Sequence, residues 1–249
     1  MTDRGIGPLV LAGSGEYTPA MDLVDRHLLD RCDGKPVILI ATACALEGAD
    51  VMTRWEQMGV AHFRRLGVDA IPVRIADQDD AGRADLAAQI AAAGLVWFSG
   101  GSAVYLARTF EGTAAWQALL AANAAGGAVA GASGGLGVLN PHLPNPGAGA
   151  AQPPTGLGLA APVRAISHFD RIAARRPEVV DRALQALAPG QALAGVDEDT
   201  AVVWTDGAWR AMGHKRVQVF ERDREPLVFG DGDRIDALPP PARSLPATQ

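Results

Sequence analysis

The stretch Ala128-Val129-Ala130-Gly131-Ala132-Ser133-Gly134-Gly135-Leu136-Gly137 begins as a short apolar run and ends in closely spaced glycines. Its central pentad, residues 131–135, has the form Gly-x-Ser-x-Gly, which is typical of a nucleophile elbow, a sharp strand-to-helix turn that exposes a serine hydroxyl above a sheet. Glycines suit such a turn because its backbone angles leave no room for a Cβ atom. The pattern predicts Ser133 as a nucleophile, with helix N–H groups facing any oxyanion that forms beside it. The alternative is that this stretch is a glycine-rich connection between a strand and a helix with no catalytic role.

Apolar strand-like runs alternate with helical patterns on the N-terminal side of this stretch. Strands are expected at residues 8–12, 36–42, 69–75, 95–98 and 128–132, and helices at 19–30, 49–66, 81–93 and between 103 and 123. This alternation predicts an α/β fold with a doubly wound, mostly parallel sheet and helices on both faces. Such sheets bind ligands at the C-terminal ends of their strands. Glycine-rich loops at 13–16, 99–102 and 131–135 follow three of these strands, so we expect a site there.

The sequence changes character after the elbow. Residues 140–156 hold five prolines and no charged side chain, which predicts a long loop lying in part over the site. A strand is expected at 161–167 and a helix at 176–187. Short strand-like runs at 192–196, 200–204, 209–212 and 217–220 predict an antiparallel C-terminal edge on the sheet. Residues 1–238 are therefore interpreted as a single α/β hydrolytic domain, followed by a proline-rich tail at 239–249 that is expected to be disordered.

Composition and charge narrow the class of protein. The 249 residues carry a net charge of −6, which argues against nucleic acid as a partner. No apolar run is long enough to span a bilayer, and the first residues lack a secretory signal, so no membrane partner and a cytoplasmic location are expected. Cys32 and Cys44 have no metal-ligand spacing and are expected to be buried thiols, so we predict no metal and no cofactor. A homodimer is the assembly left open.

A serine nucleophile needs a base, because its hydroxyl is a poor nucleophile at neutral pH. His168 is the candidate among the five histidines, because it ends a predicted strand downstream of the elbow. A structural histidine is the alternative at that position.

Six short motifs occur in a characteristic order along the chain: Gly-Ser-Gly-Glu at 13–16, Phe-Ser-Gly-Gly at 98–101, Gly-Ala-Ser-Gly-Gly at 131–135, Gly-Leu-Gly-Leu at 156–159, His-Phe at 168–169 and Val-Asp-Glu-Asp-Thr-Ala at 196–201. Together they resemble peptidase family S51, over roughly residues 8–205. The resemblance implies a class I glutamine amidotransferase-like fold and a serine peptidase with Ser133 as nucleophile and His168 as base. It also implies an oxyanion hole from the backbone N–H groups of Gly101 and Gly134, and acidic substrates with aspartyl or β-aspartyl linkages.

Three further residues are expected to contact the substrate. Glu16 and Ser102 belong to the glycine-rich loops. Arg171 follows His168 and is suited to bind a substrate carboxylate through two hydrogen bonds, although a solvated arginine is the alternative.

The sequence departs from the family pattern in one respect that concerns mechanism. No Asp or Glu lies between Glu111 and Asp170, where the family places the acid that orients the base. The group that orients His168 could then be an amide such as Asn145 or Gln152, or the carboxylate of Glu198. A site with no orienting group is the remaining alternative. Glu198 lies in an acidic turn, residues 197–200, for which a structural or site-bordering hairpin is the favoured interpretation.

We therefore predict a serine-type peptidase or amidase that hydrolyses an amide bond in a small, acidic peptide. Two alternatives stay open: a non-catalytic protein on the same fold, and an amide hydrolase or acyl transferase acting on a small metabolite.

Overall fold

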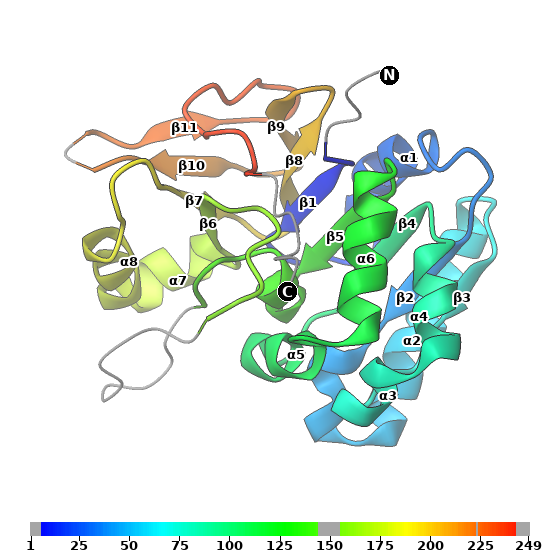
Figure 1. The fold of residues 1–249 in the computed structure, drawn as a ribbon. Coiled ribbons are helices and arrows are strands. Elements are labelled where there is room, and N and C mark those ends of the chain that lie inside the picture. The colour runs from blue at the N-terminus through cyan, green and yellow to red at the C-terminus, as the bar shows by residue number, and fades with distance from the viewer. Residues whose placement is uncertain (1–5, 144–154, 223, 243–249) are drawn as a thin grey trace.

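The computed structural model describes residues 6–143, 155–222 and 224–242. Its larger sheet has seven strands in the order β3-β2-β4-β5-β1-β8-β9 (Figure 1). These strands are β1 (Leu9–Ala12), β2 (Val37–Ile40), β3 (Ala70–Pro72), β4 (Leu95–Phe98), β5 (Ala128–Ala132), β8 (Thr200–Thr205) and β9 (Ala208–Gly213). The first five in the spatial order are parallel, whereas β8 pairs antiparallel with β1 and β9 antiparallel with β8. The predicted mostly parallel sheet with an antiparallel C-terminal edge is confirmed.

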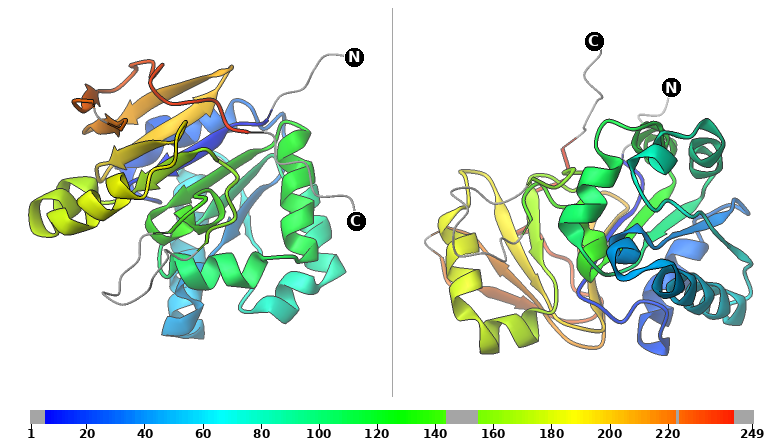
Figure 2. Two further views of the ribbon diagram at one scale, coloured as in Figure 1. Left: turned by 60° about the vertical axis from the view of Figure 1, so that its left-hand side comes forward. Right: turned by 90° about the horizontal axis from the view of Figure 1, so that it is seen from below.

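Helices cover both faces of this sheet (Figure 2). Alternate residues of β1 show the division, because Leu9 and Leu11 pack into one apolar cluster and Val10 and Ala12 into another. One face is covered by α1 (Asp22–Leu29) and α2 (Ala49–Arg65), and the other by α3 (Gln78–Gly82), α4 (Ala84–Ala91), α5 (Ala103–Phe110) and α6 (Ala114–Ala124).

Local differences from the sequence prediction concern element ends. The helix expected at 19–30 begins as a 3₁₀ turn, η1 (Pro19–Met21), and a second 3₁₀ segment, η2 (Thr42–Glu47), follows β2. The helix expected at 81–93 is two helices, since the backbone of Arg83 is extended between α3 and α4. The strand expected at 69–75 is reduced to β3.

A second sheet of four strands, which the sequence did not predict, has the order β11-β10-β7-β6. Its strands are β6 (Val163–Ile166), β7 (Ala192–Val196), β10 (Val217–Phe220) and β11 (Leu227–Phe229). Its outer face packs against α7 (Phe169–Arg175) and α8 (Pro177–Gln185), whereas Ala194, Val196 and Val219 on the inner face join a cluster shared with the larger sheet. Two of the four late strand-like runs thus belong to this sheet and two to the antiparallel edge.

The chain crosses from the second sheet to the first in the 197–199 turn, between β7 and β8. Gly13, just after β1, lies so close to this turn that a Cβ atom there would overlap the carbonyl oxygen of Asp197. The backbone N–H of His168, just after β6, donates to the carbonyl oxygen of Gly13 at 3.2 Å. Segments that follow β1, β6 and β7 therefore meet at one point, at the C-terminal end of the parallel strands.

The remaining sequence predictions concern the chain ends and the cysteines. Cys32 and Cys44 are both buried free thiols. At the start of the proline-rich tail, the indole N–H of Trp209 donates to the carbonyl oxygen of Pro239 at 2.8 Å, and residues 243–249 lie outside the described part. Within the ranges that the structure describes, no helix is both long enough and apolar enough to cross a membrane.

Candidate active site

Ser133 lies at the junction of β5 and a short 3₁₀ helix, η3 (Ser133–Val138). Its φ of 49° is in the left-handed region, where a residue with a Cβ atom is strained by about 1–3 kcal/mol. The sharp turn is therefore present as the Gly-x-Ser-x-Gly pattern predicts. The helix that follows it, however, is a six-residue 3₁₀ segment.

His168 contacts this serine directly. Its Nε2 lies 2.9 Å from Ser133 Oγ, within hydrogen-bond distance. His168 also has a left-handed backbone, with φ of 50°, and its N–H is held by Gly13. The histidine is thus fixed by its own backbone to the end of β1, beside the strand that carries the serine.

Glu198 contacts the other ring nitrogen. Its Oε1 lies 2.8 Å from His168 Nδ1, and its side chain is only 14% exposed. A neutral imidazole that donates from Nδ1 to this carboxylate leaves Nε2 free to accept from the serine hydroxyl. Of the three residues considered as orienters, only Glu198 is in the described part of the chain, because Asn145 and Gln152 fall within 144–154.

Two cations and a second carboxylate surround Glu198. Its Oε2 lies 2.9 Å from an Arg171 guanidinium nitrogen and 3.9 Å from Lys215 Nζ. Asp170 accepts from the backbone N–H of Glu198 at 3.3 Å and from Lys215 Nζ at 2.7 Å. Although burial acts to raise it, these hydrogen bonds hold the pKa of Asp170 below its usual range. Glu198 is therefore held on both its backbone and its side chain.

The sequence prediction missed Asp170 and Lys215. The proximity of Asp170 to His168 in the sequence was a signal that could have identified it. Lys215 follows β9 in an unrelated segment, and nothing local connects it with the 197–199 turn.

Gly101 and Gly134 meet next to the serine. A Cβ atom on Gly134 would overlap the carbonyl group of Gly101 and lie 2.6 Å from its nitrogen, so the two backbones approach as closely as only glycine allows. Both residues line the same cavity as Ser133. Their backbone amides are thus near the serine hydroxyl, where an oxyanion hole requires donors.

Glu16 lies under this loop instead of in the cavity. Only 6% of the residue is exposed, and its Oε1 accepts from the backbone N–H of Gly100 at 2.9 Å. A Cβ atom on Gly100 would lie 3.3 Å from Ser133 Cβ, so the carboxyl supports backbone that touches the serine. Burial raises the pKa of Glu16 above its ordinary value. The predicted substrate contact is not what the structure shows; Glu16 positions the 99–102 loop.

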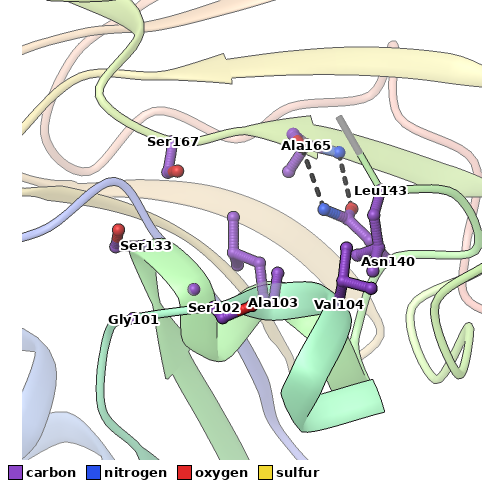
Figure 3. Close-up of a pocket in the computed structure, with 11 residues that line it drawn as sticks. Gly101, Ser102, Ala103, Val104, Ser133, Asn140, Leu143, Ala165 and Ser167 are labelled. Carbon is purple, nitrogen blue, oxygen red and sulfur yellow. Dashed lines mark hydrogen bonds between the residues drawn. The ribbon is translucent and has the colours of Figure 1, made fainter. Parts of the chain in front are cut away.

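A cavity of about 270 Å³ opens beside Ser133 (Figure 3). Its lining residues are Gly101, Ser102, Ala103, Val104, Ser133, Gly134, Leu136, Asn140, Leu143, Ala165 and Ser167. Ser102 lies in this wall, with its Oγ accepting from the N–H of Tyr105 at 3.3 Å, and its contact with substrate stays a prediction. Arg171 does not line the cavity; its side chain is 61% exposed and pairs with Glu198.

Metal chemistry has no obvious location in the described ranges. Across 6–143, 155–222 and 224–242, no three His, Cys, Asp or Glu side chains gather in a way that could hold a metal ion.

Comparison with known proteins assigns the family of this chain. The model of peptidase family S51 matches residues 9–212, so the chain belongs to that family. A crystal structure of a peptidase from an acI-B1 Actinobacterium is 31% identical, with a TM-score of 0.85 over 94% of this chain and 98% of that one. The crystal structure of a putative peptidase E protein from Listeria monocytogenes EGD-e is 16% identical and shares the fold, with a TM-score of 0.64 over 85% of this chain and all of that one. Among curated proteins, none matches the chain. The family assignment and the 31% identical peptidase support peptidase activity.

Proposed function

We propose that this protein is a serine peptidase in which Ser133 is the nucleophile, His168 the general base and Glu198 the group that orients the base. One observation carries the proposal: a continuous chain of hydrogen bonds from Ser133 Oγ to His168 Nε2 at 2.9 Å and from His168 Nδ1 to Glu198 Oε1 at 2.8 Å. The three residues come from separate segments, so a purely local folding preference does not account for the alignment.

Acylation begins when Ser133 Oγ attacks the carbonyl carbon of the scissile amide and His168 Nε2 takes the hydroxyl proton. The carbonyl oxygen becomes an oxyanion, which the amides of Gly101 and Gly134 stabilise. The C–N bond then breaks, the proton on Nε2 passes to the departing nitrogen, and the acyl group remains as an ester on Ser133.

Deacylation repeats these steps with water. His168 takes a proton from water, the hydroxide adds to the ester carbon, and Ser133 leaves with the proton from Nε2. Glu198 remains ionised throughout, since its role is to hold the Nδ1–H tautomer and to stabilise the imidazolium. Its second oxygen, Oε2, is paired with Arg171 at 2.9 Å.

The relay also bears on the two alternatives. A non-catalytic protein has no need to keep two strained left-handed residues, Ser133 and His168, in hydrogen-bond contact. This observation favours an enzyme. The acidic substrate implied by the family resemblance stays a prediction.

The test is Ser133→Ala with a fluorophosphonate probe. Wild-type protein is expected to be labelled at Ser133, as mapped by mass spectrometry of the modified peptide. Ser133→Ala should lose the label and about 10⁴- to 10⁶-fold of its amide hydrolysis while keeping its thermal unfolding transition. Activity above about a tenth of wild type in that variant would reject the assignment.

A further inference from the structure

The cavity beside Ser133 has uncharged walls. Apolar side chains form most of the surface, and none of the described residues that line it carries a charge. The apolar members are Ala103, Val104, Leu136, Leu143 and Ala165.

The polar groups in the wall are fewer than the residue names suggest. Asn140 is 1% exposed, and its amide makes two hydrogen bonds with the backbone of Ala165, at 3.0 and 2.8 Å (Figure 3). Its polar atoms are therefore committed to the protein. Ser102 Oγ accepts from the Tyr105 N–H but keeps its own O–H to donate. This hydroxyl and that of Ser167 are left to face an occupant, and both are neutral.

The cations near this site are directed elsewhere. Arg164 precedes Ala165 on β6, but it is 5% exposed and donates to the carbonyl oxygens of Ala183 and Ala186 near the end of α8. Arg171 pairs with Glu198, and Lys215 with Asp170. The sequence from 140 to 163 contains no Lys, Arg, Asp or Glu, so the segment that borders Leu143 brings no charge in any arrangement.

The position of the cavity identifies which part of the substrate enters it. The leaving nitrogen must lie near His168 Nε2, because that atom protonates it. The cavity is lined by Ser133, Gly101 and Gly134 and not by His168. It therefore lies on the acyl side of the scissile bond.

We infer that this enzyme selects an uncharged residue on the acyl side of the bond that it cleaves. The inference rests on the proposed serine peptidase function. A volume of about 270 Å³ is just below the range of roughly 300–1,000 Å³ that is usual for small-molecule pockets, so the cavity holds one residue of the substrate and not a longer segment. A carboxylate would lose its hydration without gaining a cation, which is costly. This specificity differs from the acidic substrate that the family resemblance implies.

Asparagine and aspartate form a matched pair for the test, because they differ in charge and hardly in shape. Dipeptides X-Leu, with X as Ala, Ser, Asn or Asp, are assayed both with a free and with an acetylated amino group. The value of kcat/KM for Asn-Leu is expected to exceed that for Asp-Leu by about tenfold or more. Labelling of Ser133 by diphenyl phosphonate analogues of asparagine and aspartate measures the same preference without turnover, and the asparagine analogue is expected to react faster.

Val104→Arg adds a cation to the cavity wall and should move the preference toward aspartate by about tenfold or more. Ala103→Lys is a second variant with the same purpose if the first does not fold. Leu23→Arg, at an exposed position on α1, adds the same charge outside the cavity and should leave the selectivity unchanged.

The outcomes separate the two proposals. Equal or faster reaction of the aspartate substrate and analogue overturns the inference on specificity and leaves Ser133 as nucleophile. Failure of the phosphonates and the fluorophosphonate to label Ser133 overturns the proposed function, and with it this inference.

Discussion

Replacing Glu198 by glutamine tests the part of the site that the sequence left open. The carboxylate lies 2.8 Å from His168 Nδ1, and it matters most when the imidazole becomes positively charged during the reaction. Glu198→Gln is therefore expected to lower kcat by about 10²- to 10⁴-fold and to leave KM within about threefold, because the lost interaction strengthens only as charge develops.

The magnitude follows from the geometry. Two unit charges 2.8 Å apart attract by about 6 kcal/mol at an effective dielectric constant of 20 and by about 1.5 kcal/mol in water. The histidine side chain is 33% and the glutamate side chain 14% exposed, and Arg171 offsets part of the negative charge. We therefore expect the variant to lose about 3–5 kcal/mol of transition-state stabilisation. Each 1.36 kcal/mol is a factor of ten in rate, which gives the predicted decrease in kcat of about 10²- to 10⁴-fold.

A second effect acts through the tautomer. Arg171 is a donor 2.9 Å from Oε2, so a glutamine at 198 is expected to turn its oxygen toward Arg171 and its NH₂ group toward His168. The ring would then carry its proton on Nε2, where it cannot accept from Ser133. The double variant Glu198→Gln/Arg171→Met removes this bias and should recover about tenfold of the lost kcat.

Steady-state kinetics of three further variants complete the assay. Glu178→Gln is the matched control, because it removes a carboxylate that is paired with Arg176 on the exposed surface of α8. Asn145→Ala and Gln152→Ala examine the amides considered in the sequence analysis. If Glu198→Gln keeps kcat within threefold of wild type while an amide variant collapses, the reasoning is wrong and an amide orients the base.

Two further predictions concern the glycine-rich loops. Gly134→Ala should lower kcat by about 10²- to 10³-fold, because its Cβ atom would displace the Gly101 backbone. Gly82→Ala is the control: no atom lies within 4 Å of the added carbon, so kcat should stay near wild type. Comparable kcat values for both variants would reject the oxyanion assignment. Glu16→Gln tests the buried carboxyl: its pKa is raised in the folded state, so its contribution to stability is present below the ordinary glutamate pKa and lost as pH rises through the folded value. The Tm of Glu16→Gln relative to wild type should therefore increase between pH 4 and pH 8, and a difference in Tm that does not change with pH would contradict this.

The sequence predicted the parts of the site that short-range rules determine. The left-handed turn at Ser133 is encoded by glycines on either side, and His168 by its place at a strand end. Both are local signals. Apolar runs that alternate with helical patterns along the chain predicted a mostly parallel sheet, which is why the class of the larger sheet was predictable, although its strand order was not predicted.

The rest depends on contacts between distant segments. The runs at 192–196 and 200–204 look alike in sequence, yet they belong to different sheets, because each is selected by a partner strand elsewhere in the chain. Glu198 lies in the turn between them, so its contact with His168 depends on a crossing that no local pattern specifies. The contact between Lys215 and Asp170 is harder to predict from the sequence, because Lys215 lies between β9 and β10 whereas Asp170 lies in α7.

That crossing sets the order in which the proposed catalytic apparatus is completed during synthesis. The serine is carried by a strand of the larger sheet, whereas the base follows β6 and its carboxylate partner follows β7, both of which emerge from the ribosome later. β1, at the beginning of the chain, pairs with β8 near the end, so the centre of the larger sheet is closed among the last events. Because a domain generally folds as a unit, Ser133 gains its proposed base and the carboxylate partner of that base only after β7 and β8 have been made.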